Sequence, residues 1–467
     1  MRSVLISTYE MGRQPFGLAS AAAWLRAAGW DVACIDAAKE TLQEASLVSA
    51  DLIGFHLPMH TATRLAAPII AAARRLSSSA RICGFGLYAP LNADWLRSLG
   101  VDEVLGGEFE EDLAAIARSM TDLHIDSFSA GFAGSAFNRR AGALPRIHFL
   151  VPDRSTLPSL SKYATLQMPD GRRRLVGYTE ASRGCLHLCR HCPVVPVYQG
   201  QFRVVQSDIV LADVAAQISA GAGHITFGDP DFFNGPTHAL RIVSALHEAY
   251  PSVSYDVTIK VEHLLRHRDL LPRLADTGCA FVTSAIESVD DRVLVLLDKG
   301  HTRADFIEVA ALCGEAGLTL VPTFVAFHPW LTLPSYCDLL DTIESLDLVE
   351  HVSPIQLAIR LLIPERSGLL ALDEMRVHIG PFDPATLTHP WTHTDPRVDA
   401  LQRDVMALVG TRLTADRRTL FGEVSALAHA RAEVPRRSAL QLPSAQADSR
   451  PARDRATIPY LNEPWYC

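Results

Sequence analysis

The chain has 467 residues, of which 48% are hydrophobic and 20% charged; this composition is typical of a globular protein, and the length allows two or three domains. The net charge of -9 offers no overall basic surface to nucleic acid or to an anionic membrane. No apolar run reaches the roughly 18 to 20 residues that a spanning helix needs, and the start of the chain has no signal-peptide pattern. We therefore expect a cytoplasmic protein with no nucleic-acid or membrane partner.

Residues 1–120 alternate short apolar runs with helical patterns. The runs predict five strands and the longer segments three helices: strands at 4–7, 32–35, 52–55, 81–83 and 103–105, and helices at 18–28, 61–76 and 92–99. This alternation predicts a Rossmann-like, doubly wound parallel sheet, because right-handed crossovers place helices on both of its faces. Ligands of such sheets bind at the carboxyl ends of the strands, so the loops there form the expected binding rim.

Residues 121–174 lose this periodicity and gather Gly, Ala, Ser and Pro, as expected of an inter-domain linker. From residue 175 to 370 the alternation resumes. Six further strands are predicted, at residues 176–179, 224–227, 254–260, 280–284, 318–324 and 354–362, with helical segments between them. Six strand–helix units predict a partial (β/α)6 barrel, open on one side, with its site at the carboxyl ends of the strands.

Three cysteines follow the first of these strands at the spacing C-x3-C-x2-C: Cys185, Cys189 and Cys192. Three thiolates on one loop can hold three irons of a [4Fe-4S] cluster and leave the fourth iron open to a small molecule. Two alternatives remain, a tetrahedral zinc site with His187 or His191 as fourth ligand and a redox Cys-x-x-Cys pair. Structural zinc sites normally use two separated ligand pairs, and no second pair stands near, so the spacing favours the open cluster.

From Arg183-Gly184 to Pro193, this loop resembles the cluster loop of radical S-adenosylmethionine (SAM) enzymes. The resemblance implies that the open iron binds the amino and carboxylate groups of SAM, and that one electron cleaves a carbon–sulfur bond to make a carbon radical. It also implies an electron donor such as flavodoxin or ferredoxin. His191 occupies the place of the aromatic residue that the family keeps near the adenine.

An acidic turn, Gly228-Asp229-Pro230-Asp231, directly follows the second predicted barrel strand. The radical SAM family keeps a short Gly-rich or acidic motif there, which implies that Gly228, Asp229 and Asp231 meet the ammonium group of SAM. The physical reason is the attraction of a carboxylate for a cation. The alternative is a plain turn, since Gly, Asp and Pro are turn formers.

Further candidate residues lie at the later strand ends. Ser284, Glu287 and Ser288 resemble the Glu-Ser corner of the family, which implies contacts with the ribose hydroxyls of SAM. For Ser288 the alternative is capping of the following helix. Lys260, after the third strand, and Arg360, on the sixth, are candidates to bind the SAM carboxylate or the substrate. A buried structural ion pair is an equally good interpretation of both.

Residues 1–120 resemble the cobalamin-binding-type domain that precedes the core in one large class of radical SAM enzymes. The turn at 15–19 and the corner at 107–110 carry this resemblance. The D-x-H-x-x-G signature, which offers cobalt an axial histidine, is missing from the first loop. The sequence therefore leaves cobalamin open: His56 and His60 lie on the expected rim, but loop histidines are more often satisfied by the backbone.

Two segments connect or cover these domains. Residues 151–154 resemble the inter-domain strap of the same class, which implies that they are ordered against both domains. Helical periodicity returns at 398–409 and 417–430 and predicts a helical cap. Residues 435–459 are rich in Pro, Arg, Ser, Ala and Gln and predict a flexible linker.

The tail ends in Asn462-Glu463-Pro464-Trp465-Tyr466-Cys467, and such apolar bulk is expected to dock. It resembles a CUAEP/CCAEP group of radical SAM proteins of uncertain role, whose tails read Glu-Pro-Trp-Tyr-Cys and continue with Cys or selenocysteine before Ala-Glu-Pro. The resemblance implies that the gene continues past Cys467 through a UGA codon for selenocysteine. Cys467 is accordingly a candidate catalytic thiol on a tether that reaches back toward the cluster.

We therefore predict an α/β radical SAM enzyme with a Rossmann-like domain at 1–120, a linker at 121–174, a radical SAM core at 175–370, a helical cap at 371–433 and a thiol-bearing tail at 434–467. The expected reaction is group transfer or bond formation on a small molecule, with a methyl or a 3-amino-3-carboxypropyl group transferred. The alternative is a non-enzymatic zinc- or cluster-binding interaction module.

Overall fold

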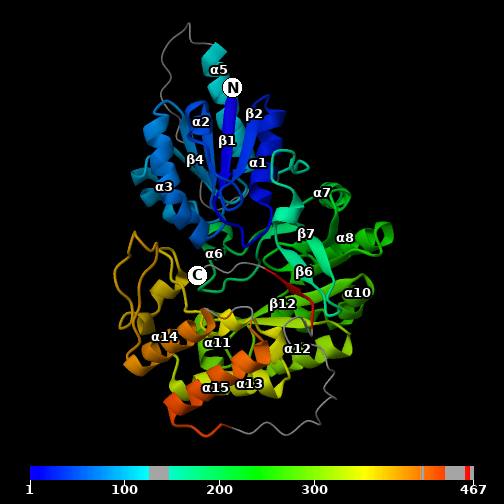
Figure 1. Ribbon diagram of the computed structural model, residues 1–467, viewed down its shortest axis with the longest axis vertical. Helices are drawn as coiled ribbons and strands as arrows, with labels where there is room; N and C mark the ends of the chain where they lie inside the picture. Colours follow the sequence, from blue (N-terminus) through cyan, green and yellow to red (C-terminus); the bar gives the residue numbers. More distant parts are fainter. Residues whose placement is uncertain (126–146, 411, 413–414, 437–457, 463–467) are drawn as a thin grey trace.

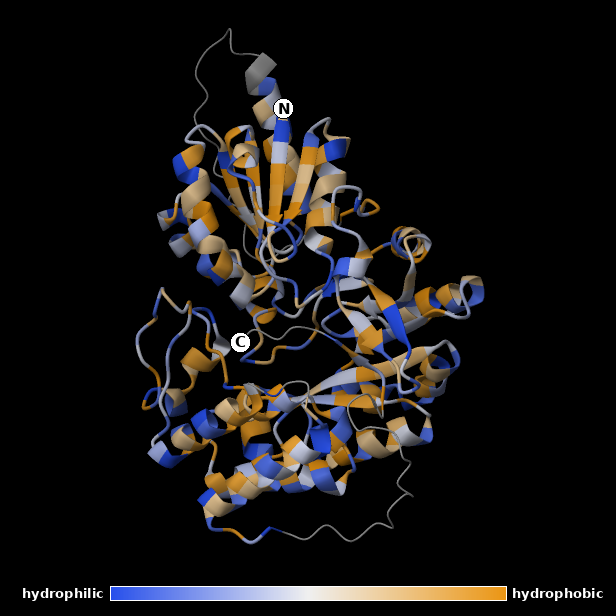
Figure 2. Ribbon diagram, in the orientation of Figure 1, coloured by the Kyte–Doolittle hydropathy of each residue, from blue (hydrophilic) through white to orange (hydrophobic). Residues whose placement is uncertain are grey.

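The computed structural model describes residues 1–125, 147–410, 412, 415–436 and 458–462. Two sheets lie one above the other along the long axis of the molecule: sheet A in the blue part of the chain and sheet B in its green and yellow part (Figure 1). The strands of sheet A are hydrophobic along most of their length, with polar residues concentrated on the surrounding helices (Figure 2). The predicted α/β architecture, a Rossmann-like sheet followed by a partial barrel, is confirmed.

Sheet A consists of five parallel strands in the order β2-β1-β3-β4-β5. Its elements are β1 (Arg2–Ser7), α1 (Phe16–Ala27), β2 (Asp31–Asp36), α2 (Glu44–Val48), β3 (Leu52–His56), α3 (His60–Leu76), β4 (Arg81–Phe85), α4 (Ala93–Ser98), β5 (Glu103–Leu105) and α5 (Glu110–Ile125). Leu5 packs with α1 and α5, whereas Val4 and Ile6 pack with α2, α3 and α4. Because neighbouring residues of a strand point to opposite faces, both faces are covered and the sheet is doubly wound.

Sheet B contains five parallel strands in the order β13-β12-β11-β10-β7, followed at the β7 edge by antiparallel β6 and β14. Its strands are β6 (Thr165–Gln167), β7 (Arg173–Thr179), β10 (Ala222–Phe227), β11 (Ser254–Thr258), β12 (Cys279–Glu287), β13 (Leu320–Phe324) and β14 (Tyr460–Leu461). Its helices are α7 (Ser207–Ser219), α8 (Pro236–Ala249), α9 (Val261–Arg266), α10 (Leu271–Asp276), α11 (Asp291–Leu297), α12 (Arg303–Glu315) and α13 (Leu333–Ser345). The parallel strands thus alternate with helices, as in a half-barrel.

The predicted sixth strand at 354–362 is not formed. A 3-10 turn, Pro354–Leu357, replaces its first half, and a single parallel bridge joins Phe327 to Arg360. Pro354 favours the start of the turn because its φ is fixed and it lacks a backbone N–H. The side chain of Gln356 then accepts a hydrogen bond from the Phe324 N–H at 3.0 Å, which takes the place of a strand partner for β13.

The tail forms a short strand just past the stretch that was predicted to be a flexible linker. Tyr460 and Leu461 make up β14, which pairs antiparallel with β6. The unpaired backbone groups of an edge strand favour such pairing, and the Arg417 guanidinium lies 4.9 Å from the centre of the Tyr460 ring. The tail therefore returns to the edge of sheet B.

The two cap helices are α14 (Pro396–Gly410) and α15 (Arg417–Ala432), close to the predicted ranges. Helix α15 packs against α13 and α14, and α14 packs against the 3-10 turn that replaces the sixth strand. They therefore extend the helical layer beyond β13. Among the described helices, none combines the length and the apolar character that crossing a bilayer demands.

The strap between the domains contacts both of them. The Asp153 N–H donates to the carbonyl of Ala19 in α1 at 2.9 Å. Arg154 makes a bidentate ion pair with Asp213 in α7, at 2.8 and 2.9 Å, and donates to the carbonyl of Tyr178 in β7 at 2.7 Å. Since a bidentate arginine–carboxylate pair fixes orientation as well as distance, the strap holds the two sheets in one arrangement.

A buried charged cluster also joins the sheets. The Arg183 guanidinium lies 2.6 Å from Glu110 at the start of α5, 2.7 Å from Glu180, and 3.9 Å from Glu108. Burial raises the pKa of Glu108 to about 7, although Arg183 acts in the opposite direction. One arginine therefore compensates carboxylates from both domains.

The Glu108→Gln variant is expected to flatten the pH dependence of stability. A carboxyl whose folded-state pKa is raised stabilises the fold most below its unfolded pKa of about 4.5, and this contribution is lost as the pH rises through about 7. Between these two pKa values, the Glu108 carboxyl lowers the free energy of unfolding by roughly 3 kcal/mol. Urea unfolding at pH 5 and pH 8 measures the free energy of unfolding at each pH. If Glu108→Gln lost as much stability between these pH values as the unmodified protein, the prediction would be contradicted.

Candidate functional site

The cysteine loop lies between the two strands of a short antiparallel pair at the carboxyl end of β7. The pair consists of β8 (Ser182–Gly184) and β9 (Phe202–Val204), with the short helix α6 (Val195–Tyr198) between them. Arg190 anchors the loop, because its backbone N–H and its guanidinium all donate to the carbonyls of residues 295–297, at 2.9 to 3.0 Å. The loop is therefore fixed to the C-terminal end of α11.

Three thiols gather on this loop. Burial raises the pKa of Cys185 to about 11 and that of Cys192 to about 12, and neighbouring thiols, including Cys189, raise them further. Lys260 lowers the pKa of Cys185, and Lys299 lowers that of Cys192. Three sulfur donors with two ammonium groups nearby suit an iron–sulfur cluster, whose binding displaces the thiol protons.

A buried, ionised carboxylate lies beside the loop. Glu287 ends β12 with a φ of +67°, where the pairing with β13 is irregular. Its carboxylate is 3.1 Å from His191 Nε2 and 3.4 Å from Lys299 Nζ. Burial by itself raises the pKa of Glu287, but Lys299 and His191 outweigh it and hold the pKa at about 2. Left-handed backbone at a non-glycine residue is a form of strain that collects at functional sites.

The neighbouring serines differ in their partners. Ser284 Oγ is buried and makes no hydrogen bond to any described residue. Ser288 Oγ accepts from the Asp290 N–H at 3.1 Å, and Asp290, rather than Ser288, caps α11. Glu287 and Ser288 line a cavity of about 280 Å³ together with His328. The corner thus borders a cavity, whereas its contact with the cysteine loop runs through Glu287 and His191.

Both carboxylates of the acidic turn point into the protein. Asp229 accepts hydrogen bonds from residues 181 and 182 at 2.9 and 2.5 Å, and burial raises its pKa to about 7. Asp231 lies within ion-pair distance of two histidines. At Gly228 a Cβ would lie 1.8 Å from the Tyr178 hydroxyl, so the close packing requires glycine. The expected contact of this turn with SAM stays a prediction, and it competes with these partners.

Two predicted cations are in ion pairs. Lys260 Nζ lies 3.7 Å from Glu262. Arg360 lies 2.7 Å from Asp399, and its guanidinium is 3.6 Å from the centre of the Trp391 ring. For both side chains the structure supports the ion-pair interpretation. Lys260 also acts on the cysteine loop, whereas Arg360 is held by the cap helix α14.

A cavity of about 220 Å³ lies between the carboxyl-end loops of sheet A and the β8–β9 pair. Its lining includes Gly17, Gly86, Gly107 and His56 from sheet A, and Arg183, Tyr198 and Gly228 from the other domain. His56 Nδ1 lies 2.7 Å from Glu10, whereas His60 contacts the backbone carbonyl of Thr386. The expected rim of sheet A therefore faces the cysteine-bearing domain across a shared cavity.

A third cavity, of about 290 Å³, lies inside the half-barrel. Its lining includes Thr226, Asp256, Thr283 and Thr323 from the strands and residues 458–461 from the tail. The docked tail therefore contributes a wall to the barrel interior. Cys467, the candidate thiol of that tail, lies outside the described residues.

Sequence reasoning missed two features of this region. Lys299 was not assigned a role, yet it lies between Glu287 and the thiols. His263 was not singled out, yet it contacts Asp231. The signal available for His263 was its position just after the carboxyl end of the third predicted strand, where site residues gather.

Comparisons with known proteins agree with this geometry. The Radical SAM superfamily matches residues 179–343. The cobalamin-dependent SAM radical enzyme OxsB with aqua-cobalamin and SAM is similar in structure, with a TM-score of 0.68 and 14% identity over 92% of this chain and 72% of that one. The radical SAM methyltransferase TsrM from Kitasatospora setae, with tryptophan and aza-SAM, gives a TM-score of 0.59 and 16% identity over 87% and 88%. No curated protein matches the chain in sequence.

Proposed function

Because residues 179–343 form a radical SAM domain, we propose that Cys185, Cys189 and Cys192 hold the [4Fe-4S] cluster of a radical SAM enzyme, with SAM bound beside it. Such a domain implies both cofactors. When bound and reduced, the cluster would supply the electron that cleaves a carbon–sulfur bond of SAM. The observation that carries the proposal is the gathering of three thiols on one loop, fixed to α11 at the carboxyl end of sheet B.

Two lysines near this loop can stabilise an anionic group there. Burial favours the protonated thiols, and mutual repulsion disfavours three thiolates close together. Lys260 and Lys299 oppose both effects, because an ammonium group favours a neighbouring thiolate. We assign these lysines to charge compensation.

The Glu-Ser corner is proposed to bind the nucleoside part of SAM. Glu287 is ionised at neutral pH, so its carboxylate can accept hydrogen bonds from ribose hydroxyls. Ser288 lines the same cavity, and Ser284 has an unsatisfied buried hydroxyl. His191, which lies within hydrogen-bond distance of Glu287, is proposed to lie beside the adenine.

We further propose that cobalamin binds in the cavity between the sheets. OxsB, which resembles this chain over most of its length, has a structure with aqua-cobalamin. The residues that would hold the cofactor here are Gly17, Gly86 and Gly107, which line the cavity without a side chain, and His56, whose ring packs against Gly17 and Gly86. The Nδ1 of His56 contacts the Glu10 carboxylate, and a carboxylate partner is usual for a metal-ligating histidine.

The proposed reaction is methyl transfer to a small molecule, with an electron donor such as flavodoxin or ferredoxin. The half-barrel cavity is the proposed substrate site, since Thr226, Asp256 and Thr283 offer polar groups near apolar walls. Transfer of the 3-amino-3-carboxypropyl group is the second candidate. It is favoured by β14, which brings the thiol-bearing tail to this cavity.

Mass spectrometry of SAM-derived products separates these reactions. The protein, reconstituted anaerobically with iron and sulfide and then reduced, is expected to form S-adenosylhomocysteine only when cobalamin is present. Methylthioadenosine formed without cobalamin would instead indicate transfer of the aminocarboxypropyl group. Omission of the reductant is the control. One bound zinc, no iron and no SAM product would refute the enzyme and favour an interaction module.

A further inference from the structure

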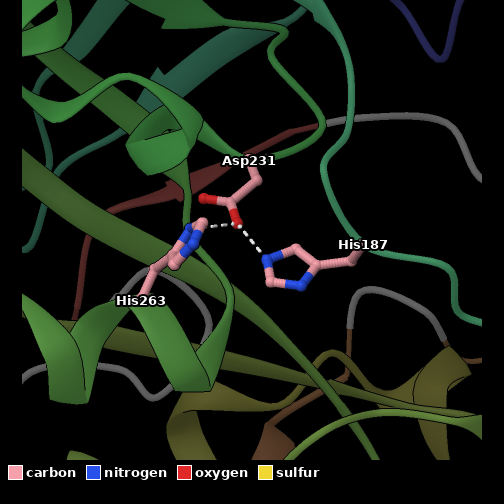
Figure 3. Close-up of side chains that lie close together, drawn as sticks. All are labelled: His187, Asp231 and His263. Carbon is pink, nitrogen blue, oxygen red and sulfur yellow. Dashed lines mark ion pairs between the residues drawn. The ribbon is translucent and has the colours of Figure 1, made fainter. Parts of the chain in front are cut away.

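Three metal-binding side chains converge beside the cysteine loop, outside the cysteine set. His187 comes from the loop, Asp231 from the turn after β10, and His263 from α9, and their side chains point toward one another (Figure 3). Asp231 Oδ2 lies 2.7 Å from His263 Nδ1 and 3.3 Å from His187 Nε2. One donor atom from each residue lies within 4.8 Å of the other two.

These donor atoms are buried and poorly satisfied. Asp231 is 1% exposed and His263 is 2% exposed. The contacts are short enough for ion pairs, but Asp231 Oδ2, His187 Nε2 and His263 Nδ1 make no hydrogen bond of acceptable geometry with any described residue. Buried polar atoms without partners are uncommon, because leaving them unpaired is costly. A cation between them would satisfy all three.

The surrounding contacts are those of a metal site. The second oxygen of Asp231 accepts from the Phe233 N–H at 3.1 Å, which fixes the carboxylate. The second nitrogen of His187, Nδ1, lies 3.5 Å from Glu262. Metal-ligating histidines commonly direct their other ring nitrogen to a carboxylate. The ligand orientations are therefore set before any ion binds.

We propose that His187, Asp231 and His263 bind one divalent first-row transition-metal ion. Two imidazoles and one carboxylate form the donor set of non-haem Fe²⁺ sites, which keep coordination positions open. Zinc also accepts these donors. The ion would carry water or a substrate oxygen at its open positions and act as a Lewis acid. The inference does not rest on the proposed SAM reaction, since no cysteine is among the ligands.

Cobalt titration of a cysteine-free loop tests this site. In the Cys185→Ser/Cys189→Ser/Cys192→Ser variant no thiolate of the loop can bind metal, so Co²⁺ reports on nitrogen and oxygen donors. We expect one Co²⁺ per chain, with visible absorption bands but no thiolate-to-cobalt charge transfer. Asp231→Asn keeps an oxygen that can accept the hydrogen bond from the Phe233 N–H. Adding this change to the variant is expected to weaken Co²⁺ binding by about 100-fold or more.

His267 provides the matched control. Its ring centre lies 5.9 Å from that of His263, but it is not one of the three ligands, so adding His267→Phe is expected to leave the affinity for Co²⁺ within about twofold. Circular dichroism monitors folding of each variant. Absence of Co²⁺ binding in a folded protein that lacks the three loop cysteines would overturn the proposal, as would equal losses from Asp231→Asn and His267→Phe. Because the titration uses neither SAM nor reductant, its outcome is separate from that of the proposed reaction.

Discussion

Changing Cys189 to serine is expected to remove the cluster and all cleavage of SAM. Serine is a poor ligand for iron, and two remaining thiols cannot hold a cluster that needs three protein ligands. Iron content after anaerobic reconstitution should fall to background. SAM-derived products should fall by at least about 1000-fold, because without the cluster no group remains that can pass an electron to SAM. Iron analysis and mass spectrometry measure both quantities in the same sample.

The buried thiol of Cys279 offers a matched control. Cys279 begins β12, and its thiol donates to the carbonyl of Phe281 at 3.3 Å, a bond that a serine hydroxyl can also make. Cys279→Ser is therefore expected to retain iron and SAM cleavage. If Cys189→Ser kept the iron content and activity of the unmodified protein, the assignment of this loop would be wrong.

Changing Arg183 to methionine should cause the largest loss of stability. The guanidinium compensates Glu108, Glu110 and Glu180 in a buried cluster, and its centre lies 5.0 Å from that of the Phe149 ring. Methionine fills part of the volume but leaves buried carboxylates uncompensated. Removal of one partner from a buried ion pair costs roughly 3–5 kcal/mol, to be measured by urea unfolding at pH 7.

The pH dependence of this loss identifies its cause. Without Arg183, the folded-state pKa values of Glu108 and Glu180, which burial already raises, rise further above their unfolded values, so the variant loses more stability than the unmodified protein as the pH rises from 5 to 8. Arg97→Met, which removes an exposed pair with Asp94, is expected to change stability by less than about 1 kcal/mol. A loss for Arg183→Met that is independent of pH would indicate packing rather than charge.

Much of the fold follows from local patterns. The five strands of sheet A and three of its helices, α1, α3 and α4, were predicted because each buried strand is a short apolar run and each of these helices repeats every three to four residues. The C-x3-C-x2-C spacing identified the cysteine loop for the same reason: its three cysteines lie within eight consecutive residues, so the chain itself brings them together.

The sixth strand was wrongly predicted and the strand at 460–461 was not foreseen, because both depend on distant partners. Residues 354–362 have the composition of a strand, but Pro354 and the Gln356–Phe324 contact replace strand pairing. The tail has the composition of a flexible linker, but Tyr460 and Leu461 meet an unpaired edge at β6. Composition does not reveal whether an edge is available.

The sequence alone determined the two-sheet architecture and the loop that gathers three thiols, because both depend on residues close together in the chain. The tertiary structure alone decided the partners of the charged groups. Lys299 reaches Glu287 from another loop, and His263 reaches Asp231 from the helix after the next strand. Parallel strands bring these loops to the same edge of the sheet, and a side chain's partner there depends on packing across elements, which residue spacing does not encode.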